Sequence, residues 1–301
     1  MKKAWMFSGQ GTQEVGMARE LMDAFPEFLA VITRADRITG RPISGMMRNG
    51  PKEFLDRTSN TQIAVVAVSL GLLAVYRKRH KAEIPDYVIG HSVGEGAAAV
   101  AADAIDEEDA LAWVNERGLT MEEEGKRHPG KMAAILGLKD AVVERITANN
   151  GSVVANYNIP DQQIVVSGGN DEVDRTIEEA NEEGARRTVV LGVTIPAHSP
   201  LMSGGIERVA RFMNSIRVKD PSVPIAANIG RIITLADQLK DAYPNQLKLP
   251  VRWSQSVEEL YEAGVRQFRE FGHGDVLSSM VKRQLKDKGV HVEHAEDCLK
   301  R

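Results

Sequence analysis

Short apolar runs alternate with longer apolar or amphipathic stretches along the first 130 residues of this chain. Ala4–Phe7 and Tyr87–Ile89 are short apolar runs, which are typical of buried strands. Between them, Thr61–Arg79 is expected to form a long apolar helix, and two further helices are expected at Gly96–Ala104 and Glu107–Glu124. Strands that alternate with helices in this way predict a largely parallel sheet covered by helices on both faces.

The spacing of apolar residues changes in the middle of the chain. Four strand-like runs and two helical stretches are expected there, in the order β-α-β-β-α-β: Met132–Leu138, Ala141–Ala148, Ser152–Asn156, Gln163–Ser167, Asp171–Glu183 and Arg187–Leu191. The second and third strands are separated by a turn at Pro160 and Asp161. This order is the ferredoxin-like pattern.

The segment Gly90–Glu95 directly follows the second strand-like run and fits the pattern G-x-S-x-G. In that pattern a buried strand ends, the chain turns sharply at a serine, and a helix follows. Gly90 and Gly94 permit the tight turn, which holds the hydroxyl of Ser92 out from the end of the sheet, near the positive end of a helix dipole. The pattern favours a nucleophilic serine. The alternative is a plain strand-to-helix connection in which Ser92 only caps the helix.

These elements predict an α/β protein with two domains. The large one is α/β-hydrolase-like, has a parallel sheet, and comprises residues 1–124 and 196–301. The small one is ferredoxin-like and is inserted at residues 125–195. Its first boundary is the polar linker Glu124–Gly130, and its second lies near Pro196. A cleft between two such domains is a common place for a ligand.

Composition excludes several classes of protein. Of 301 residues, 43% are apolar and 27% charged, as in an ordinary globular protein. The net charge of −4 is spread along the chain, so nothing indicates nucleic acid or a membrane surface as a partner. No apolar run approaches the roughly 20 residues that span a bilayer, and no signal-like segment is visible. The single cysteine, Cys298, fits a reducing compartment. We therefore expect a cytoplasmic protein, and a monomer because no interface signature is visible.

A serine hydroxyl needs a base to become nucleophilic, and the chain has seven histidines. His91 adjoins Ser92 and is expected to point away along the turn. Four others lie in basic stretches or in the polar C-terminal tail: His80, His128, His291 and His294. Of the remaining two, we favour His198, where the chain re-enters the large domain at the cleft, over His273. The alternative for either is a histidine that only ties down a loop. No acid stands out by spacing, so a triad and a dyad oriented by a backbone carbonyl both stay open.

Arg117 lies on or beside the inward face of the predicted helix Glu107–Glu124. The apolar stripe of that face recurs at helical spacing: Leu111, Val114, Gly118 and Met121. A partly buried guanidinium needs an anionic partner, and its fork matches a carboxylate. Spacing alone leaves a substrate carboxylate and two structural readings equally open. The structural readings are a surface side chain or a pair with a nearby acid: Glu116, Glu122 or Glu123.

The loop Gly9–Gly11 follows the first strand, so its amides are expected to face the same cleft. One of them, paired with the amide of Val93, would form an oxyanion hole for acyl transfer. Taken alone, the loop is better read as a plain glycine turn.

Together these residues resemble the malonyl-CoA:acyl carrier protein transacylases and the wider acyltransferase family of fatty acid and polyketide synthesis. The similarity covers nearly the whole chain. The family-like segments occur in order: Phe7–Gln13, Asn60–Gln62, Gly90–Glu95, Glu116–Gly118, Asn156–Asn158, Ala197–Met202, Gln246–Leu247 and Pro250–Trp253. Each segment is modest alone, but the ordered set is highly specific.

The resemblance implies a ping-pong reaction. Ser92 attacks the thioester of malonyl-CoA with His198 as general base, and the amides of Gln10 and Val93 hold the oxyanion. Arg117 grips the free malonyl carboxylate. The phosphopantetheine thiol of a holo acyl carrier protein, deprotonated by the histidine, then takes the acyl group.

The resemblance also implies that the backbone carbonyl of Gln246 orients the histidine, in agreement with the missing triad acid. It places Met121, Ala197 and Asn156 beside the acyl group. It implies no metal and no cofactor other than the coenzyme A thioester substrate.

Some positions depart from the usual family pattern without removing a catalytic group: Ser8, Gly96, Asn228–Gly230 and Gly272–Gly274. Ala197 stands where malonyl-specific members often have phenylalanine. The small side chain leaves room beside the acyl group, so groups related to malonyl are also expected as substrates.

Two other functions compete with this reading. A thioesterase-like editor of acyl carrier proteins needs the same serine and histidine but admits water, and it gains nothing from Arg117. A non-catalytic carrier-binding subunit would not need Ser92 or His198. Carrier proteins are usually acidic, so three basic segments are candidate docking patches, although each is also typical of a solvated surface: Arg77–Lys81, Lys126–Arg127 and Lys282–Arg283.

Overall fold

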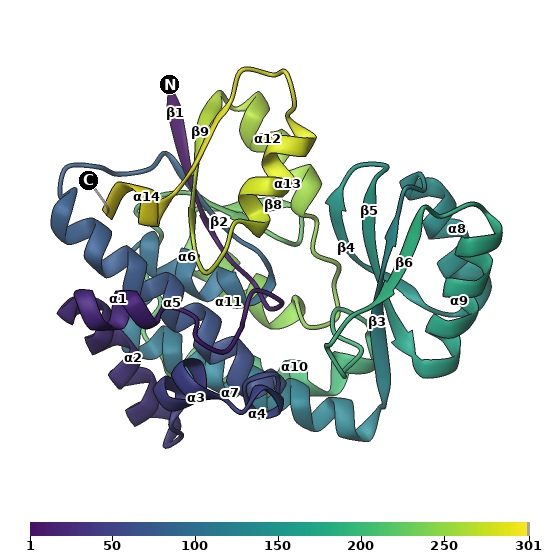
Figure 1. Ribbon diagram of the computed structural model, residues 1–301, viewed down its shortest axis with the longest axis horizontal. Helices are drawn as coiled ribbons and strands as arrows, with labels where there is room; N and C mark the ends of the chain where they lie inside the picture. Colours follow the sequence, from purple (N-terminus) through teal and green to yellow (C-terminus); the bar gives the residue numbers. More distant parts are fainter. Residues whose placement is uncertain (300–301) are drawn as a thin grey trace.

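The computed structural model describes residues 1–299 and has two α/β domains of unequal size (Figure 1). Residues of both domains line a cleft between them. The large domain has a six-stranded sheet in the order β10-β9-β1-β2-β7-β8. All neighbouring strands are parallel except β7 and β8, so the prediction of a largely parallel sheet is confirmed. The strands are β1 (Lys2–Phe7), β2 (Tyr87–Gly90), β7 (Ile225–Ala227), β8 (Arg231–Ile233), β9 (Val265–Phe271) and β10 (His291–His294). The last of these belongs to the predicted polar tail, which is therefore partly an edge strand.

Side chains of β1 alternate between two hydrophobic cores, one on each face of the sheet. Trp5 and Phe7 pack on one side, whereas Ala4 and Met6 pack on the other. The first core is covered by α2 (Pro26–Thr39), α5 (Thr58–Arg79), α6 (Glu95–Ala101) and α7 (Glu107–Arg127), and the second by α12 (Trp253–Glu262) and α13 (Val276–Gln284). Further helices complete the domain: α1 (Arg19–Ala24), α3 (Ile43–Asn49), α4 (Lys52–Leu55), α10 (Ile206–Ser215), α11 (Ala236–Asn245) and α14 (Ala295–Leu299).

Helix α5 is the central helix of the first core. By length and composition it would suffice to cross a membrane, contrary to the expectation that no apolar run is long enough. However, 94% of its most apolar window is buried inside the protein, where it packs against α2 and α7. The helix begins at Thr58, three residues earlier than predicted, because the polar residues of its first turn are buried as well. Its apolar character thus reflects burial on all sides.

The small domain is a four-stranded antiparallel sheet in the order β4-β5-β3-β6, with two helices on one face (Figure 1). Its elements are β3 (Gly130–Leu136), α8 (Asp140–Asn150), β4 (Val153–Ile159), β5 (Gln163–Gly169), α9 (Asn170–Glu182) and β6 (Arg187–Val190). This order of elements and strands confirms the ferredoxin-like fold. Residues on the other face of the sheet, such as Met132, Ala134 and Val165, line the cleft.

The connection into the small domain is shorter than predicted. Helix α7 runs on to Arg127, so the expected linker Glu124–Gly130 is wrong in extent, and only two residues separate the helix from β3. The helix continues because Glu124 and Gly125 are buried. A Cβ atom on Gly125 would lie 2.2 Å from Cγ2 of Ile195, so the two crossings between the domains pack tightly against each other. The domain limits at 124/125 and 195/196 stay predictions.

Candidate active site

The turn at Ser92 has the geometry of a nucleophile elbow. Strand β2 ends at Gly90, Ser92 has a φ of +50°, and a short 3-10 turn, η1 (Ser92–Gly94), leads into α6. A Cβ atom on Gly90 would lie 2.2 Å from the amide nitrogen of Glu95, and one on Gly94 would lie 2.3 Å from the carbonyl oxygen of Phe7. Strained backbone of this kind persists where the surrounding structure fixes it, often at functional sites.

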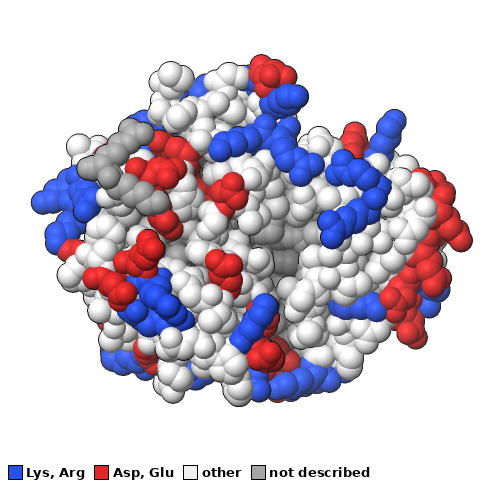
Figure 2. Space-filling view, viewed as in Figure 1, with Lys and Arg blue, Asp and Glu red and all other residues white. Residues whose placement is uncertain are grey.

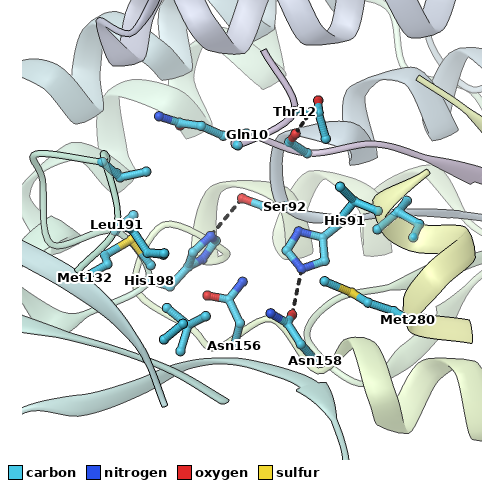
Figure 3. Close-up of a pocket in the computed structure, with 18 of the residues that line it drawn as sticks. Gln10, Thr12, His91, Ser92, Met132, Asn156, Asn158, Leu191, His198 and Met280 are labelled. Carbon is cyan, nitrogen blue, oxygen red and sulfur yellow. Dashed lines mark hydrogen bonds between the residues drawn. The ribbon is translucent and has the colours of Figure 1, made fainter. Parts of the chain in front are cut away.

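Ser92 is paired with His198 across the cleft. Its Oγ lies 2.7 Å from Nε2 of the histidine (Figure 3). The other ring nitrogen, Nδ1, lies 2.9 Å from the carbonyl oxygen of Gln246 and 3.2 Å from that of Leu249. Carbonyl oxygens only accept, so Nδ1 carries the hydrogen and Nε2 is free to accept the serine proton. Within residues 1–299 no carboxylate bonds to this imidazole, so the contacts are those of a Ser–His pair oriented by backbone carbonyls. That this pair acts as a catalytic dyad stays a prediction.

Burial keeps the imidazole neutral. Burial, together with the positive charge of Arg117, lowers the pKa of His198 to about 3, although the bonds to the two carbonyls oppose the shift. At neutral pH the ring is therefore unprotonated. It is in the state that a general base requires.

The other histidines lie differently from His198. His273 pairs with Glu14, 2.8 Å away, and does not line the cleft. The prediction that His91 points away is wrong: its ring lines the cleft, with Nε2 3.0 Å from Oδ1 of Asn158 (Figure 3). The ring also packs on Trp253, with centroids 5.6 Å apart.

Arg117 is fully buried and lies directly behind the serine. Nη1 donates to Gln62 Oε1 at 2.6 Å, and Nη2 donates to Gln246 Oε1 at 2.7 Å and to Ser92 Oγ at 3.2 Å. Burial lowers the pKa of the guanidinium to about 10, opposed by the charge of Glu95, so the group stays positive at neutral pH.

The acids expected as structural partners of Arg117 are engaged elsewhere. Glu116 pairs with Arg208, Glu122 with Lys126, and Glu123 with Arg127. Arg117 has no ion pair in the described part of the chain. A buried positive charge held only by neutral groups is suited to receive an anionic ligand.

The cleft contains a cavity of about 290 Å³ beside the dyad. Its wall is largely apolar on the side of the small domain, and Figure 2 shows the corresponding hollow between the domains. Met121, Ala197, Asn156 and Gln10 line it. That the first three surround the acyl group stays a prediction. Val93 follows the serine at the start of η1. That the amides of Gln10 and Val93 form the oxyanion hole stays a prediction.

Several polar residues complete the site without having been assigned a role from sequence. Asn228 accepts the amide hydrogen of Ser92 at 2.6 Å and donates to the carbonyl of Gly90 at 2.5 Å, which ties both sides of the elbow together. Glu95 and Gln62 lie in family-like segments, but their hydrogen-bond partners are far away in sequence. Glu95 bonds to Asn228 and Gln246, and Gln62 bonds to Arg117. The one feature of the sequence that could have revealed such a role is Gln62, a polar residue inside the apolar helix α5.

No group of three or more His, Cys, Asp or Glu side chains suited to a metal ion occurs among residues 1–299. The expectation that the chemistry uses no metal stays a prediction.

Comparison with known proteins agrees with this geometry. A family described as "Acyl transferase domain" matches residues 4–298. A malonyl CoA-acyl carrier protein transacylase of Bacillus subtilis (strain 168) is 35% identical over 288 residues, which cover 94% of this chain and 90% of that protein.

Two solved structures extend the similarity to the fold. The malonyl CoA-acyl carrier protein transacylase of Coxiella burnetii has a TM-score of 0.93 at 32% identity, covering 100% of this chain and 96% of that one. A malonyl-transacylase solved in complex with its type II polyketide synthase acyl carrier protein has a TM-score of 0.91 at 31% identity, covering 98% and 95%. The chain belongs to the acyl transferase domain family.

Proposed function

We propose that this protein transfers a malonyl, or related α-carboxyacyl, group from coenzyme A to the phosphopantetheine thiol of an acyl carrier protein. The observation that carries the proposal is the pairing of Ser92 with His198 directly in front of Arg117, a buried cation with no carboxylate partner among the described residues. A serine needs a base such as His198 to act as a nucleophile. An acyl group that bears a carboxylate needs a positive charge such as that of Arg117 to bind it.

In the first half-reaction, Ser92 Oγ attacks the thioester carbonyl while its proton passes to Nε2 of His198. The amides of Gln10 and Val93 stabilise the negative charge that develops on the carbonyl oxygen. The carbon–sulfur bond then breaks, and the coenzyme A sulfur leaves with the proton from the histidine. The product is an ester between the acyl group and the serine.

In the second half-reaction, the carrier's thiol gives its proton to His198 and attacks the ester. The carbon–oxygen bond breaks, and Ser92 recovers its proton from the histidine. The proton that leaves with coenzyme A in the first half-reaction is replaced by the proton of the carrier thiol in the second, so the protein ends in the state in which it began.

The acyl group is selected by charge and by volume. Nη2 of Arg117 lies 3.2 Å from the oxygen that carries the acyl group, which is close enough for a carboxylate two carbons along the chain. Ala197 is small and lines the cavity together with Met121, so substituents larger than hydrogen on the α-carbon are accommodated. An editing thioesterase for simple acyl chains would leave the buried charge without a partner.

The carrier protein approaches along the edge of the cleft that α13 forms. Arg283, in the basic segment Lys282–Arg283, bonds to Gln162 of the small domain at 3.3 Å. Figure 2 shows Lys and Arg side chains on both sides of the hollow, which suit an acidic carrier. In the other two candidate patches, several side chains are already paired: Lys78 with Glu27, and Arg127 with Glu123.

The remaining parts of the proposal follow from the sequence. The protein acts as a monomer in the cytoplasm and needs no cofactor beyond its thioester substrate. Nucleic acid and membranes are not partners.

Intact-mass measurement tests the proposal. After incubation with malonyl-CoA we expect a malonyl adduct on Ser92 that survives in water and is transferred to an added holo carrier protein. An adduct only with acetyl-CoA, or rapid hydrolysis without a carrier, would overturn the proposal. The Ser92→Ala variant is the control that assigns the adduct to the serine.

A further inference from the structure

Amide oxygens, not carboxylates, hold Arg117 in place. Gln62 and Gln246 each accept one of its N–H bonds through a neutral side-chain oxygen. A carboxylate at either position would form a direct buried ion pair with the guanidinium. That pair would compensate the charge that an incoming acyl carboxylate is meant to compensate. Neutral acceptors fix the geometry of the guanidinium without neutralising it.

The side-chain amide of Gln246 serves this purpose in only one orientation. Its Oε1 faces Arg117, and its Nε2 donates to the carbonyl oxygen of Ser92 at 3.1 Å and to Oε2 of Glu95. If the amide were turned over, its NH₂ group would face the guanidinium, donor against donor. The three partners therefore specify which end of the amide Arg117 meets.

Glu95 links this amide to the elbow. It is the first residue of α6 and is 1% exposed. Oε1 accepts the backbone N–H of Asn228 at 2.7 Å, and the side chain of Asn228 holds the amide hydrogen of Ser92. Both carboxylate oxygens of Glu95 thus accept from N–H donors. The glutamate touches none of the reacting atoms, and the catalytic steps above do not use it.

We propose that Glu95 and the side chain of Gln246 act as a positioning pair that determines specificity for acyl groups bearing a carboxylate. Gln246 presents a neutral oxygen to Arg117, and Glu95 fixes that orientation by accepting a hydrogen bond from the other end of the amide. The inference rests on the proposed function, since it concerns the carboxylate that Arg117 receives.

Exchanging the two side chains tests the pair. The double variant Glu95→Gln/Gln246→Glu keeps the same set of side chains, but moves the carboxyl group next to Arg117. The measurement is the ratio of acylation rates of Ser92 with malonyl-CoA and with acetyl-CoA, followed by intact mass. We expect this ratio to fall about 100-fold in the exchanged variant, because a charged hydrogen-bond partner for the substrate is lost.

A matched control separates this effect from general damage. Glu270 is another fully buried glutamate of the large domain, and it holds Ser8 and the first residues of α13 instead of Arg117. In the Glu270→Gln variant the acylation rates with malonyl-CoA and acetyl-CoA are expected to change by the same factor, so their ratio stays as in the wild type. An exchanged variant that keeps the wild-type ratio would overturn the inference.

Labelling of Ser92 by an uncharged fluorophosphonate shows whether the exchanged variant folds. If labelling is lost, a second variant provides the test. Gln246→Met retains the backbone carbonyl that orients His198 and removes only the amide. We expect its malonyl-to-acetyl ratio to fall roughly 10-fold, because the guanidinium loses a fixed acceptor. An unchanged ratio would refute the role of the side chain. A wild-type protein that does not load malonyl would instead refute the proposed function.

Discussion

Ser92 combines a strained backbone with two different neighbours, one that accepts its proton and one that carries a fixed positive charge. The histidine is kept neutral by burial, and the arginine keeps its charge because its pKa, although lowered, stays near 10. Burial lowers both pKa values, but it leaves the histidine neutral and the arginine charged, because their ordinary pKa values lie far apart.

Replacing Arg117 with alanine is expected to reduce malonyl loading on the order of 100-fold, because a buried charged contact to the substrate carboxylate is lost. Acetyl loading is expected to fall much less. Arg117→Lys keeps the charge but loses the fork, so its malonyl loading should lie between wild type and alanine. Equal losses for both acyl groups would show that the arginine is structural. The rates are measured by single-turnover intact mass.

Replacing His198 with alanine is expected to slow acylation of Ser92 by about 10³- to 10⁴-fold, because the hydroxyl loses its general base. His273→Ala is the matched control: that histidine pairs with Glu14 outside the cleft, so its rate is expected to stay near wild type. Comparable losses in the two variants would remove His198 from its assigned role. Stopped reactions with malonyl-CoA, analysed by mass, give both rates.

At the scale of elements, helix α13 is held at its N-terminus by a side chain from a neighbouring strand. Glu270, in β9, accepts the backbone N–H groups of Leu277 at 3.1 Å and Ser278 at 2.7 Å. It also accepts the hydroxyl of Ser8 at 2.9 Å, just before the loop that carries Gln10. One buried carboxylate thus fixes both α13 and the loop at the cleft, and it complements the helix dipole.

Glu270→Ala is expected to lower the free energy of unfolding by about 2 kcal/mol or more, because three buried donors lose their acceptor. Glu262→Ala, at an exposed position of α12, is the control and should change stability by less than about 0.5 kcal/mol. Urea titrations of both variants provide the comparison. A Glu270→Ala protein as stable as wild type would mean that water replaces the lost contacts.

At the scale of the whole molecule, the two domains are joined by more than the two chain crossings. Strand β4 of the small domain exchanges backbone hydrogen bonds with Val251, in the segment that follows Gln246. His91 bonds to Asn158 across the same cleft. The cleft that holds the dyad is therefore also a folded interface, and burying His198 there links stability to pH.

His198 has a lowered pKa in the folded protein and an ordinary one, about 6.5, when unfolded. Its contribution to stability is therefore full above pH 6.5 and is lost as the pH falls toward 3. Between pH 6.5 and pH 5 the loss is about 2 kcal/mol. His198→Asn should remove this part of the pH dependence, as measured by urea unfolding at both pH values. Identical pH dependence in the two proteins would contradict the buried, neutral state of the ring.

The periodicity of apolar residues was enough to predict the parallel sheet, its helices and the ferredoxin-like insertion, because these patterns are local. Errors arose where burial extended an element beyond its local signal, as at Thr58 and at Glu124–Arg127. The serine elbow was visible because its strained turn demands glycines at fixed positions. His198 was selected by elimination and by its expected place at the cleft.

What sequence alone left open were the partners of charged and polar side chains. Spacing placed Arg117 on an inward face but allowed an ion pair with a neighbouring acid. The tertiary structure shows that these acids pair with other residues. It also shows that Gln62 and Gln246, from distant segments, bond to the guanidinium. Likewise it decided that backbone carbonyls, which have no sequence signature, orient the histidine. Local patterns determine elements, whereas hydrogen-bond partners depend on how those elements pack.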